Sequence, residues 1–403
     1  MKRKSILKWF VIFMLLSLLL CACGKQEEST AATEESGYSH SIRSTDCDRN
    51  FSIGFGQFGV CSTEDTLYFV GDPVRDAGAW IWFSDRKTGL TMPLCGKADC
   101  SHSGSTCNAY FAGKFYCLSA YDGKLFWLGR DQLGIFHMYS CEPDGTDHKE
   151  YAIENNELLQ SITSGMTAFI HRGYTYFYGE CSVVKNGEPS MESALVRCPV
   201  RGGAAENVVY EPYNGAAFVA QPYGDSVFLV CTKSRTFEDH TVEITRIDCT
   251  TLEKKLLCSE KCGFVNGMWV AENGVYLSCA DATKLHFFDF AAQKITVPFD
   301  LDPDEAYLRQ LDFGDNKVIA MEREGSFDLL VTDFEGNTLL QKSYDLEISK
   351  KMQDRYSYIA KTQGTDSENI YIYFREFSRE SDSSLMRFPL DGSDPVVLWS
   401  DNN

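Results

Sequence analysis

The sequence predicts an all-β fold, a seven-bladed β-propeller made of four-stranded antiparallel blades. From residue 52 onward, short runs rich in Tyr, Phe, Trp, Val and Ile alternate with Gly/Asp turns, as strands and hairpins do. The same unit recurs seven times, at intervals of 43 to 58 residues. With 44% apolar and 13% aromatic residues, the chain can build a core of this size.

Two strands of the repeated unit can be read directly. The first is a triplet that follows a tight turn, and its copies are Leu67-Tyr68-Phe69, Leu125-Phe126-Trp127, Thr175-Tyr176-Phe177, Val227-Phe228-Leu229, Val275-Tyr276-Leu277, Val318-Ile319-Ala320 and Ile370-Tyr371-Ile372. The second includes Ile81-Trp82-Phe83, Leu195-Val196-Arg197 and Leu385-Met386-Arg387. Because a four-stranded sheet cannot bury both faces alone, radial stacking is expected. Six or eight blades, or two stacked β-domains, are the alternatives.

The repeated unit resembles a known family. Its order of turn, apolar-Tyr-Phe strand, loop, apolar-Tyr-Arg strand and Asp-Gly turn is similar to YWTD-type propellers, which are related to those of low-density-lipoprotein receptors. Versions are common on surface lipoproteins of clostridial-type bacteria. The resemblance covers residues 52–400, although Tyr-Trp-Thr-Asp itself does not occur. It implies the fold and not a receptor-like activity.

The N-terminus has the pattern of an export signal. Four basic residues lie within the first eight, and an apolar run of 14 residues follows, which is too short to span a bilayer. The run ends in Leu20-Cys21-Ala22-Cys23-Gly24, which resembles a bacterial lipobox. That resemblance implies cleavage after residue 22, a lipid on Cys23 and attachment to the outer face of the cell membrane. An uncleaved anchor or a plain signal peptide is the alternative.

Cleavage would leave a strongly acidic protein on a tether. Residues 1–22 carry four basic and no acidic side chains, so their removal changes the net charge from −19 to −23. Such a chain is not expected to bind nucleic acid. Residues 23–51 lack apolar periodicity and are predicted to be the lipidated cysteine and a flexible tether, with the propeller spanning residues 52–403.

Loop lengths predict which face of the propeller is functional. Loops between the second and third strands, and loops between blades, share one face, and these are the long ones. We expect ligand-binding residues there, in segments that include Glu180–Glu192 and Thr232–Thr241. The alternative is that this face only tolerates insertions.

The sharpest local motif lies at residues 93–110, between the first and second blades. Cys95, Cys100, His102 and Cys107 have the spacing C-x4-C-x-H-x4-C. Three thiolates and one imidazole suit a structural zinc ion, since a closed set of four ligands leaves no position for catalysis. A disulfide within the loop, or free thiols, would also fit. A similar segment recurs near the start of the clostridial-type lipoproteins.

The remaining cysteines are harder to interpret, because connectivity cannot be read from sequence. Cys181 and Cys198 are expected on neighbouring strands of the third blade, and Cys231 and Cys249 on neighbouring strands of the fourth. Each pair could meet across a ladder. Buried free thiols would explain them equally well.

These observations favour a ligand-binding or protein-interaction module whose partner is a surface protein, a peptide or a glycan. No elbow motif of hydrolases and no zinc-protease motif occurs in the sequence, and the seven histidines are scattered. Propeller enzymes can assemble a site from distant blades, so a hydrolase or lyase acting on glycans or peptides is the second hypothesis. A structural envelope protein is the third.

Overall fold

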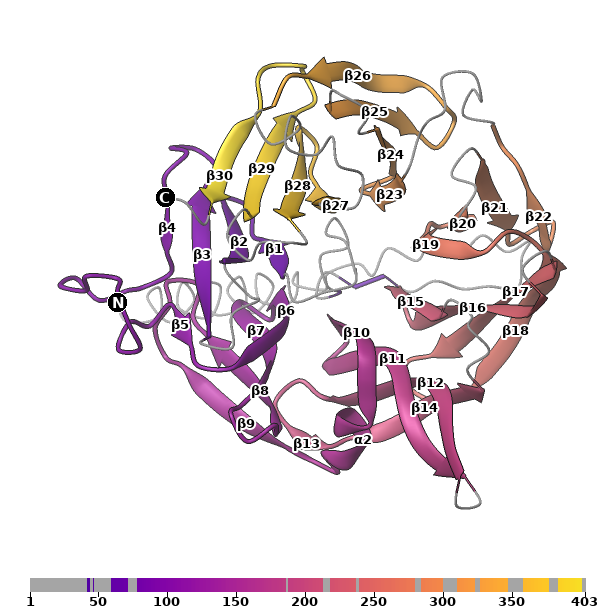
Figure 1. The fold of residues 1–403 in the computed structure, drawn as a ribbon, viewed down its shortest axis with the longest axis horizontal. Coiled ribbons are helices and arrows are strands. Elements are labelled where there is room, and N and C mark those ends of the chain that lie inside the picture. Colours follow the sequence, from indigo (N-terminus) through magenta and orange to yellow (C-terminus); the bar gives the residue numbers. More distant parts are fainter. Residues whose placement is uncertain are drawn as a thin grey trace, which may run out of the picture.

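The structure is a computed structural model, and it shows a seven-bladed β-propeller (Figure 1). It describes residues 42–43, 46, 59–71, 78–185, 188–212, 218–236, 239–279, 284–299, 310–322, 327–346, 358–376 and 383–400. Seven sheets surround one axis, and the first four strands of each come from one contiguous part of the chain. The predicted fold class and the blade count are confirmed.

The blades follow one another in chain order. Blades 1 to 3 consist of β1 (Val60–Ser62), β2 (Thr66–Gly71), β3 (Ala79–Asp85), β4 (Thr91–Pro93) and β5 (Tyr110–Phe111); β6 (Lys114–Tyr121), β7 (Lys124–Arg130), β8 (Phe136–Cys141) and β9 (Lys149–Glu154); and, after the single-turn helix α2 (Glu157–Gln160), β10 (Ile162–His171), β11 (Tyr174–Lys185), β12 (Glu188–Pro199) and β14 (Glu206–Pro212). Between β12 and β14, β13 (Gly203–Ala204) pairs with β9 and so links blade 3 to blade 2.

Blades 4 to 7 each contain four strands. They are β15 (Phe218–Tyr223), β16 (Ser226–Thr236), β17 (Asp239–Asp248) and β18 (Lys254–Lys261); β19 (Val265–Val270), β20 (Gly274–Cys279), β21 (Leu285–Asp289) and β22 (Lys294–Thr296); β23 (Gln310–Gly314), β24 (Lys317–Glu322), β25 (Phe327–Asp333) and β26 (Thr338–Tyr344); and β27 (Tyr358–Thr365), β28 (Asn369–Glu376), β29 (Ser383–Pro389) and β30 (Val396–Ser400). The first strand of each blade lies nearest the axis and the last forms the outer edge (Figure 1).

The two predicted sets of strands are the second and third strands of the blades. Leu67-Tyr68-Phe69 lies in β2, and Phe69 pairs with Trp82 of β3. Tight turns join the first and second strands, as at Asp122 and Gly123, whose φ angles of +50° and +72° suit a two-residue hairpin.

Burial explains why the second strands read as continuous apolar runs. All six residues of β20 are buried, whereas most of β18, at the outer edge of its blade, is exposed. A second strand has a neighbouring blade against each of its faces, so both of its side-chain rows are apolar.

Apolar packing between blades holds the ring together. There is one buried cluster at each of the seven blade interfaces. The cluster between blades 7 and 1 closes the ring, where Phe69 and Tyr371 are buried together. In the described residues no strand is shared between these two blades, so side chains carry the closure. Arg86 and Asp366 add an ion pair of 3.4 Å.

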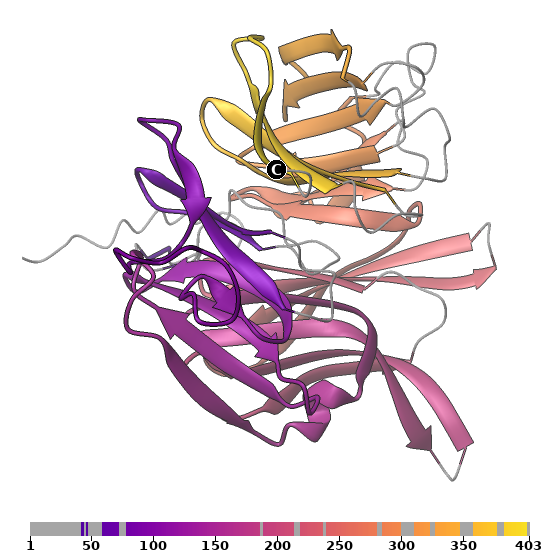
Figure 2. The same cartoon turned by 60° about the vertical axis from the view of Figure 1, so that its left-hand side comes forward.

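Two segments predicted as long loops are strands. The β11–β12 ladder runs without interruption from Tyr174 opposite Pro199 to Lys185 opposite Glu188, and β16 pairs with β17 from Ser226 to Thr236. Both hairpins extend beyond the ring on the same side of the molecule (Figure 2). The prediction of loops at Glu180–Glu192 and Thr232–Thr241 is therefore wrong, because strand pairing continues to Lys185 opposite Glu188 and to Thr236 opposite Asp239.

The N-terminal features lie mostly outside the described residues, Cys23 among them. Within the predicted tether, Asp46 pairs with Arg172 in the turn between β10 and β11 of blade 3, at 2.9 Å and with both side chains largely buried. This end of the tether is thus in contact with the propeller. No helix among the described residues is long and apolar enough to cross a membrane.

Candidate metal centre

The Cys/His loop is an insertion in the outer edge of blade 1. Strand β4 pairs with the second half of β3, from Trp82 to Ser84, while β5 pairs with its beginning, Ala79 and Trp80. The fourth strand is therefore split in two, and residues 94–109 lie between the halves. Ile81 stands at the gap and bonds to both ends of the loop. Its carbonyl accepts from the Leu94 amide at 2.8 Å, and its amide donates to the Ala109 carbonyl at 2.8 Å.

The loop packs against blade 2 as well. The side-chain amide of Asn108 donates to the Gly145 carbonyl at 3.0 Å, in the turn between β8 and β9. Gly96 approaches the same turn so closely that a Cβ there would lie 2.8 Å from the Thr146 methyl group. The insertion is thus held by a blade on each side, which gives four side chains in a short loop a fixed frame.

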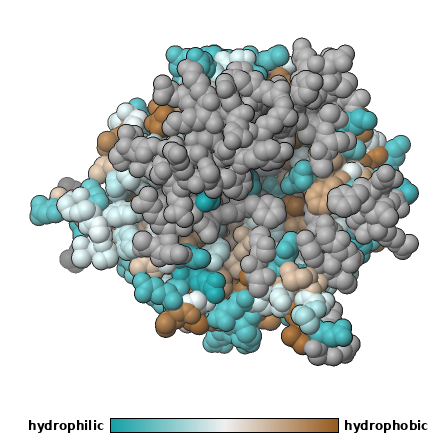
Figure 3. Space-filling view, viewed as in Figure 1, coloured by the Kyte–Doolittle hydropathy of each residue, from teal (hydrophilic) through white to brown (hydrophobic). Residues whose placement is uncertain are grey.

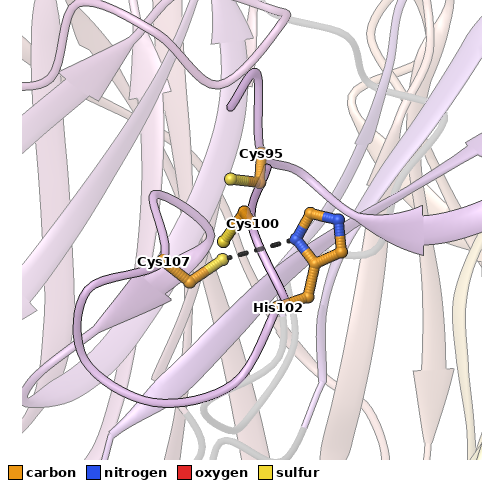
Figure 4. A group of neighbouring side chains, drawn as sticks. All are labelled: Cys95, Cys100, His102 and Cys107. Carbon is orange, nitrogen blue, oxygen red and sulfur yellow. Dashed lines mark hydrogen bonds between the residues drawn. The ribbon is translucent and has the colours of Figure 1, made fainter. Parts of the chain in front are cut away.

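We call Cys95, Cys100, His102 and Cys107 the rim cluster. One ligand atom from each residue lies within 4.8 Å of all the others. Figure 4 shows the thiols and the imidazole turned toward a common point, and the Cys107 sulfur lies 3.7 Å from Nδ1 of His102. Cys107 is buried and the other three are partly exposed. His102 has a φ of +51°, which turns the chain so that its ring meets the thiols.

The thiols of the rim cluster differ in their acidity. Burial favours the neutral thiol of Cys95, but amide N–H groups of Lys97 and Asn108 and the neighbouring thiols together lower its pKa to about 6. The pKa of Cys107 rises to about 12, mainly because of burial, with the other two thiols adding to the rise. Amides directed at sulfur are the usual surroundings of a metal-bound thiolate, which they stabilise.

The predicted four-residue set is therefore brought together as a group that could hold a metal ion. Its cysteines are free thiols in the structure. Three sulfurs and a nitrogen around one point match the donor set of a closed tetrahedral centre. Such a centre has a structural role, because it leaves no position for substrate.

Comparisons with solved structures agree on the fold. An acylaminoacyl peptidase of Pyrococcus horikoshii matches 89% of this chain over 54% of its own length, with a TM-score of 0.53 and 10% identity. A prolyl endopeptidase matches 87% of this chain over 50% of its own, with a TM-score of 0.52 and 10% identity. The chain thus spans about half the length of these peptidases. No protein-family model matches the sequence, and no curated protein sequence is similar to it.

The other predicted cysteine pairs do not meet. Cys181 of β11 is opposite Glu192, whereas Cys198 of β12 is opposite Thr175, six positions along the same ladder. Cys231 is opposite Glu243, far from Cys249 at the other end of its blade. All four are buried free thiols, and burial is the main cause of their raised pKa values. They pack as small apolar side chains.

The predicted ligand-binding residues have varied environments. Glu192 and Thr232 are buried, and the Thr232 hydroxyl accepts a hydrogen bond from the Val265 amide at 3.3 Å, which joins blade 4 to blade 5. Glu180 and Thr241 are partly exposed on the two projecting hairpins. Their role in binding stays a prediction.

A second thiol–imidazole group is not evident in the sequence pattern. It consists of Cys262, Cys279 and His286, which come from two blades. The sequence places Cys262 near Cys258, but no motif links Cys262 to a residue 17 positions away on another blade. The nearest signal is the dipeptide Cys262-Gly263, which repeats the Cys95-Gly96 of the rim cluster.

Proposed function

We propose that this chain is a lipid-anchored protein-interaction module on the outer face of the bacterial cell membrane, built on a YWTD-like propeller. Cys23 would carry the lipid, and residues 24–45 would hold the propeller away from the bilayer. The contact of Asp46 with Arg172 would mark the point where the tether meets the folded part.

The projecting hairpins carry this proposal. Val184 and Met191, at the tip of the β11–β12 hairpin, are 74% and 38% exposed. Ser182 is the cross-strand partner of Met191 and lies two residues from Val184, so Val184 and Met191 share one face of the hairpin. Apolar surface colour also appears near the tip of this hairpin in Figure 3. A raised, rigid hairpin with apolar side chains facing solvent suits contact with another protein.

The charge of the chain indicates the chemistry of that partner. The mature protein would have a net charge of −23, so a basic or neutral protein surface with an apolar patch would fit the hairpin best. An anionic envelope polymer would be repelled. A glycan or a short peptide usually binds in a concave site, which a projecting hairpin tip does not offer.

Site-specific crosslinking in the native envelope tests the interaction. We expect a photo-crosslinking residue in place of Val184 to give a discrete protein adduct. The same residue in place of Val396, which is 41% exposed on the outer edge of blade 7, should give none. Equal labelling at both positions, or adducts only with glycan, would refute the proposed protein interface.

Membrane attachment has its own test. With four positive charges removed from an already acidic chain, the acyl chains must supply the membrane affinity, and two or more chains anchor firmly. Cys23→Ala is expected to block incorporation of a clickable palmitate analogue and to release the protein from membranes. Unchanged labelling or unchanged fractionation would contradict the lipoprotein assignment.

The rim cluster would hold a structural Zn²⁺. A tetrahedral ion with Zn–S distances of about 2.3 Å and Zn–N distances of about 2.0 Å separates its ligand atoms by roughly 3.5–3.8 Å. The 3.7 Å between the Cys107 sulfur and His102 Nδ1 fits that range. The double variant Cys95→Ser/Cys107→Ser should bind one equivalent of zinc less than the wild type. An equal zinc content, or a disulfide among these cysteines in the wild type, would refute the assignment.

A propeller-type hydrolase is the second candidate, favoured by the shared fold with peptidase propellers. The matched region is about half of those peptidases, so any peptidase activity of this chain would need a site of its own. Incubation of the full chain with fluorogenic peptide and glycan libraries tests it. Turnover that survives removal of contaminating enzymes would replace the interaction module as the primary function.

A further inference from the structure

The junction between blades 4 and 5 brings together Cys262, Cys279 and His286, which we call the junction cluster. Cys262 follows β18 directly, and its amide donates to the His240 carbonyl at 3.0 Å, which extends the outer ladder of blade 4 by one residue. Cys279 is the last residue of β20 and His286 the second of β21. Two rigid strands of blade 5 and the end of blade 4 therefore fix the three side chains.

The spacing of the group is compact. Its three ligand atoms lie within 4.8 Å of one another, and the sulfurs of Cys262 and Cys279 are 3.6 Å apart. Cys279 is 1% exposed, whereas Cys262 and His286 are partly exposed. A Cβ on Gly263 would lie 2.9 Å from the Cys279 Cβ, so a glycine is needed for the two blades to approach this closely.

We propose that Cys262, Cys279 and His286 bind a Zn²⁺-class cation with an open fourth position. Two thiolates and one imidazole are ligands that favour Zn²⁺ among the divalent ions, whereas carboxylate-bound ions such as Mg²⁺ or Ca²⁺ would not be held. Ligand sulfurs on a tetrahedral zinc ion are about 3.8 Å apart, close to the observed 3.6 Å. Among the described residues, no further Cys, His, Asp or Glu belongs to this group.

The location of the cluster decides how its fourth position could be used. The C-terminal ends of β18 and β20 lie on the face from which the β11–β12 and β16–β17 hairpins project. With Cys262 and His286 partly exposed, the open position can accept water or an incoming donor such as a thiolate, imidazole or carboxylate. This site is independent of the proposed protein interface and of the rim cluster.

The cluster differs from the buried cysteines elsewhere in the propeller. Cys258, four residues before Cys262 in the same interface core, is also buried and free, but it belongs to no such group in the described residues. It serves as the matched control, because its substitution disturbs the same core without removing a ligand.

Metal titration of the full chain in detergent tests the proposal. The background carries Cys95→Ser/Cys107→Ser, which silences the rim cluster. After stripping with chelator under reducing conditions, this protein should bind one equivalent of Zn²⁺ or Co²⁺. The Co²⁺ form should show thiolate-to-metal charge-transfer bands of a two-thiolate site. Adding Cys262→Ser or His286→Ala should lower the affinity at least about hundredfold, since loss of even an outer-shell partner of a metal ligand costs about 10–100-fold. Adding Cys258→Ala should leave it unchanged.

Three results would overturn the proposal. They are no bound metal in the background protein, equal affinity in the ligand and control variants, and a Cys262–Cys279 disulfide in protein isolated without air, detected as a mass two units lower that resists alkylation. His286→Ala keeps both thiols and lies at a partly exposed position, so its circular dichroism and melting curve separate loss of metal from failure to fold.

Discussion

The rim cluster and the junction cluster use the same side chains in opposite settings. All four residues of the rim cluster lie within 13 positions of one loop, which is attached to Ile81 of blade 1 and to the β8–β9 turn of blade 2. The three residues of the junction cluster lie on or next to strands of two blades, and one of them is buried in an apolar core. In the first case a metal would order the chain, whereas in the second the fold orders the ligands.

The difference between a loop site and a strand site can explain why the two clusters offer different numbers of ligands. A loop without a strand ladder of its own gains order from a closed set of ligands, and the rim cluster supplies four. A site on rigid strands does not need the metal to fold, so it can leave a coordination position open. A preformed three-ligand set is therefore better suited to exchange or binding than a four-ligand loop.

The largest expected effect comes from removing a ligand of the rim cluster. Cys107→Ser should increase the rate of tryptic cleavage after Lys97 about hundredfold. This corresponds to about 2.7 kcal/mol of loop-opening free energy, a small part of the roughly 10 kcal/mol that binding of a structural zinc ion can supply. Lys97 is exposed in the loop, and its Nζ donates to the Thr106 carbonyl at 2.6 Å. The rate is followed by mass spectrometry of the nicked chain, at a protease concentration that leaves the propeller intact.

The control for this prediction is His286→Ala, which removes a ligand of the junction cluster. It should leave cleavage after Lys97 at the wild-type rate. A wild-type cleavage rate in Cys107→Ser would show that the strand pairing and Asn108 order the loop without a metal, and the contrast between the clusters would disappear.

A smaller effect is expected from the glycine that follows the first cysteine of each cluster. Gly263→Ala places a Cβ 2.9 Å from the Cys279 Cβ, which β20 holds, so overpacking should cost about 1–3 kcal/mol of unfolding free energy. Gly96→Ala meets the Thr146 methyl group at 2.8 Å and the Asp144 carbonyl at 3.1 Å, both in a turn at the surface that can shift, and should cost less. Chemical denaturation of both variants measures the difference.

The two glycine variants also distinguish an effect on folding stability from an effect on metal binding at the junction cluster. Gly263→Ala should weaken metal binding at the junction cluster, because it moves a ligand, while Gly96→Ala should change only the packing of the loop on blade 2. An equal loss of unfolding free energy in the two variants would mean that the blade 4–blade 5 junction adjusts to an added methyl group as easily as the rim loop does. The junction cluster would then not be a rigid, preformed site.

Periodicity was sufficient for the fold, because each blade repeats one local pattern. The Leu67-Tyr68-Phe69 strand and its six counterparts are buried on both faces. Burial on both faces produces consecutive, mostly apolar residues, which can be recognised in the sequence. The hairpin extensions were not predictable in this way. Residues such as Glu180 and Thr241 look like loop residues, since an exposed strand and a loop have the same polar composition.

The two candidate sites also differ in how far local sequence patterns can predict them. The rim cluster could be found from spacing, because its ligands are local in sequence. The junction cluster depends on the register by which Val265 pairs with Cys279 and Leu277 with His286, and on the approach of blade 4 to blade 5. Neither is encoded in a short motif. In the sequence, Cys262 lies nearest to Cys258, four positions away, and nothing links it to Cys279.

A modest effect is expected at the contact between the rim loop and blade 2. Asn108→Ala removes the hydrogen bond to the Gly145 carbonyl, and the loss should be about 0.5–1 kcal/mol. The cost is at the low end because His148 Nε2 also bonds this carbonyl, at 3.2 Å, so the acceptor keeps a partner. Cleavage after Lys97 should rise only a few-fold, far less than in Cys107→Ser. A rise as large as that of Cys107→Ser would make the docking contact, and not the ligand set, the main source of order in the loop.

The smallest effect concerns the acid sensitivity of the turn on which the rim loop rests. The Asp144 carboxylate accepts hydrogen bonds from the Thr146 hydroxyl at 2.6 Å and from its amide at 2.9 Å, and these lower the pKa of Asp144 below its usual 3.8. Because the folded pKa is depressed, this contribution is complete above pH 3.8 and is lost as the pH falls through the lower folded value. Asp144→Asn should therefore lower stability by a constant amount between pH 7 and about 5, and the difference from wild type should vanish at the acid end. Urea unfolding at pH values from 7 to well below the usual pKa of 3.8 measures it. A difference that grows on acidification would mean that the carboxylate is destabilising in the folded turn, and that the rim loop rests on the backbone of this turn alone.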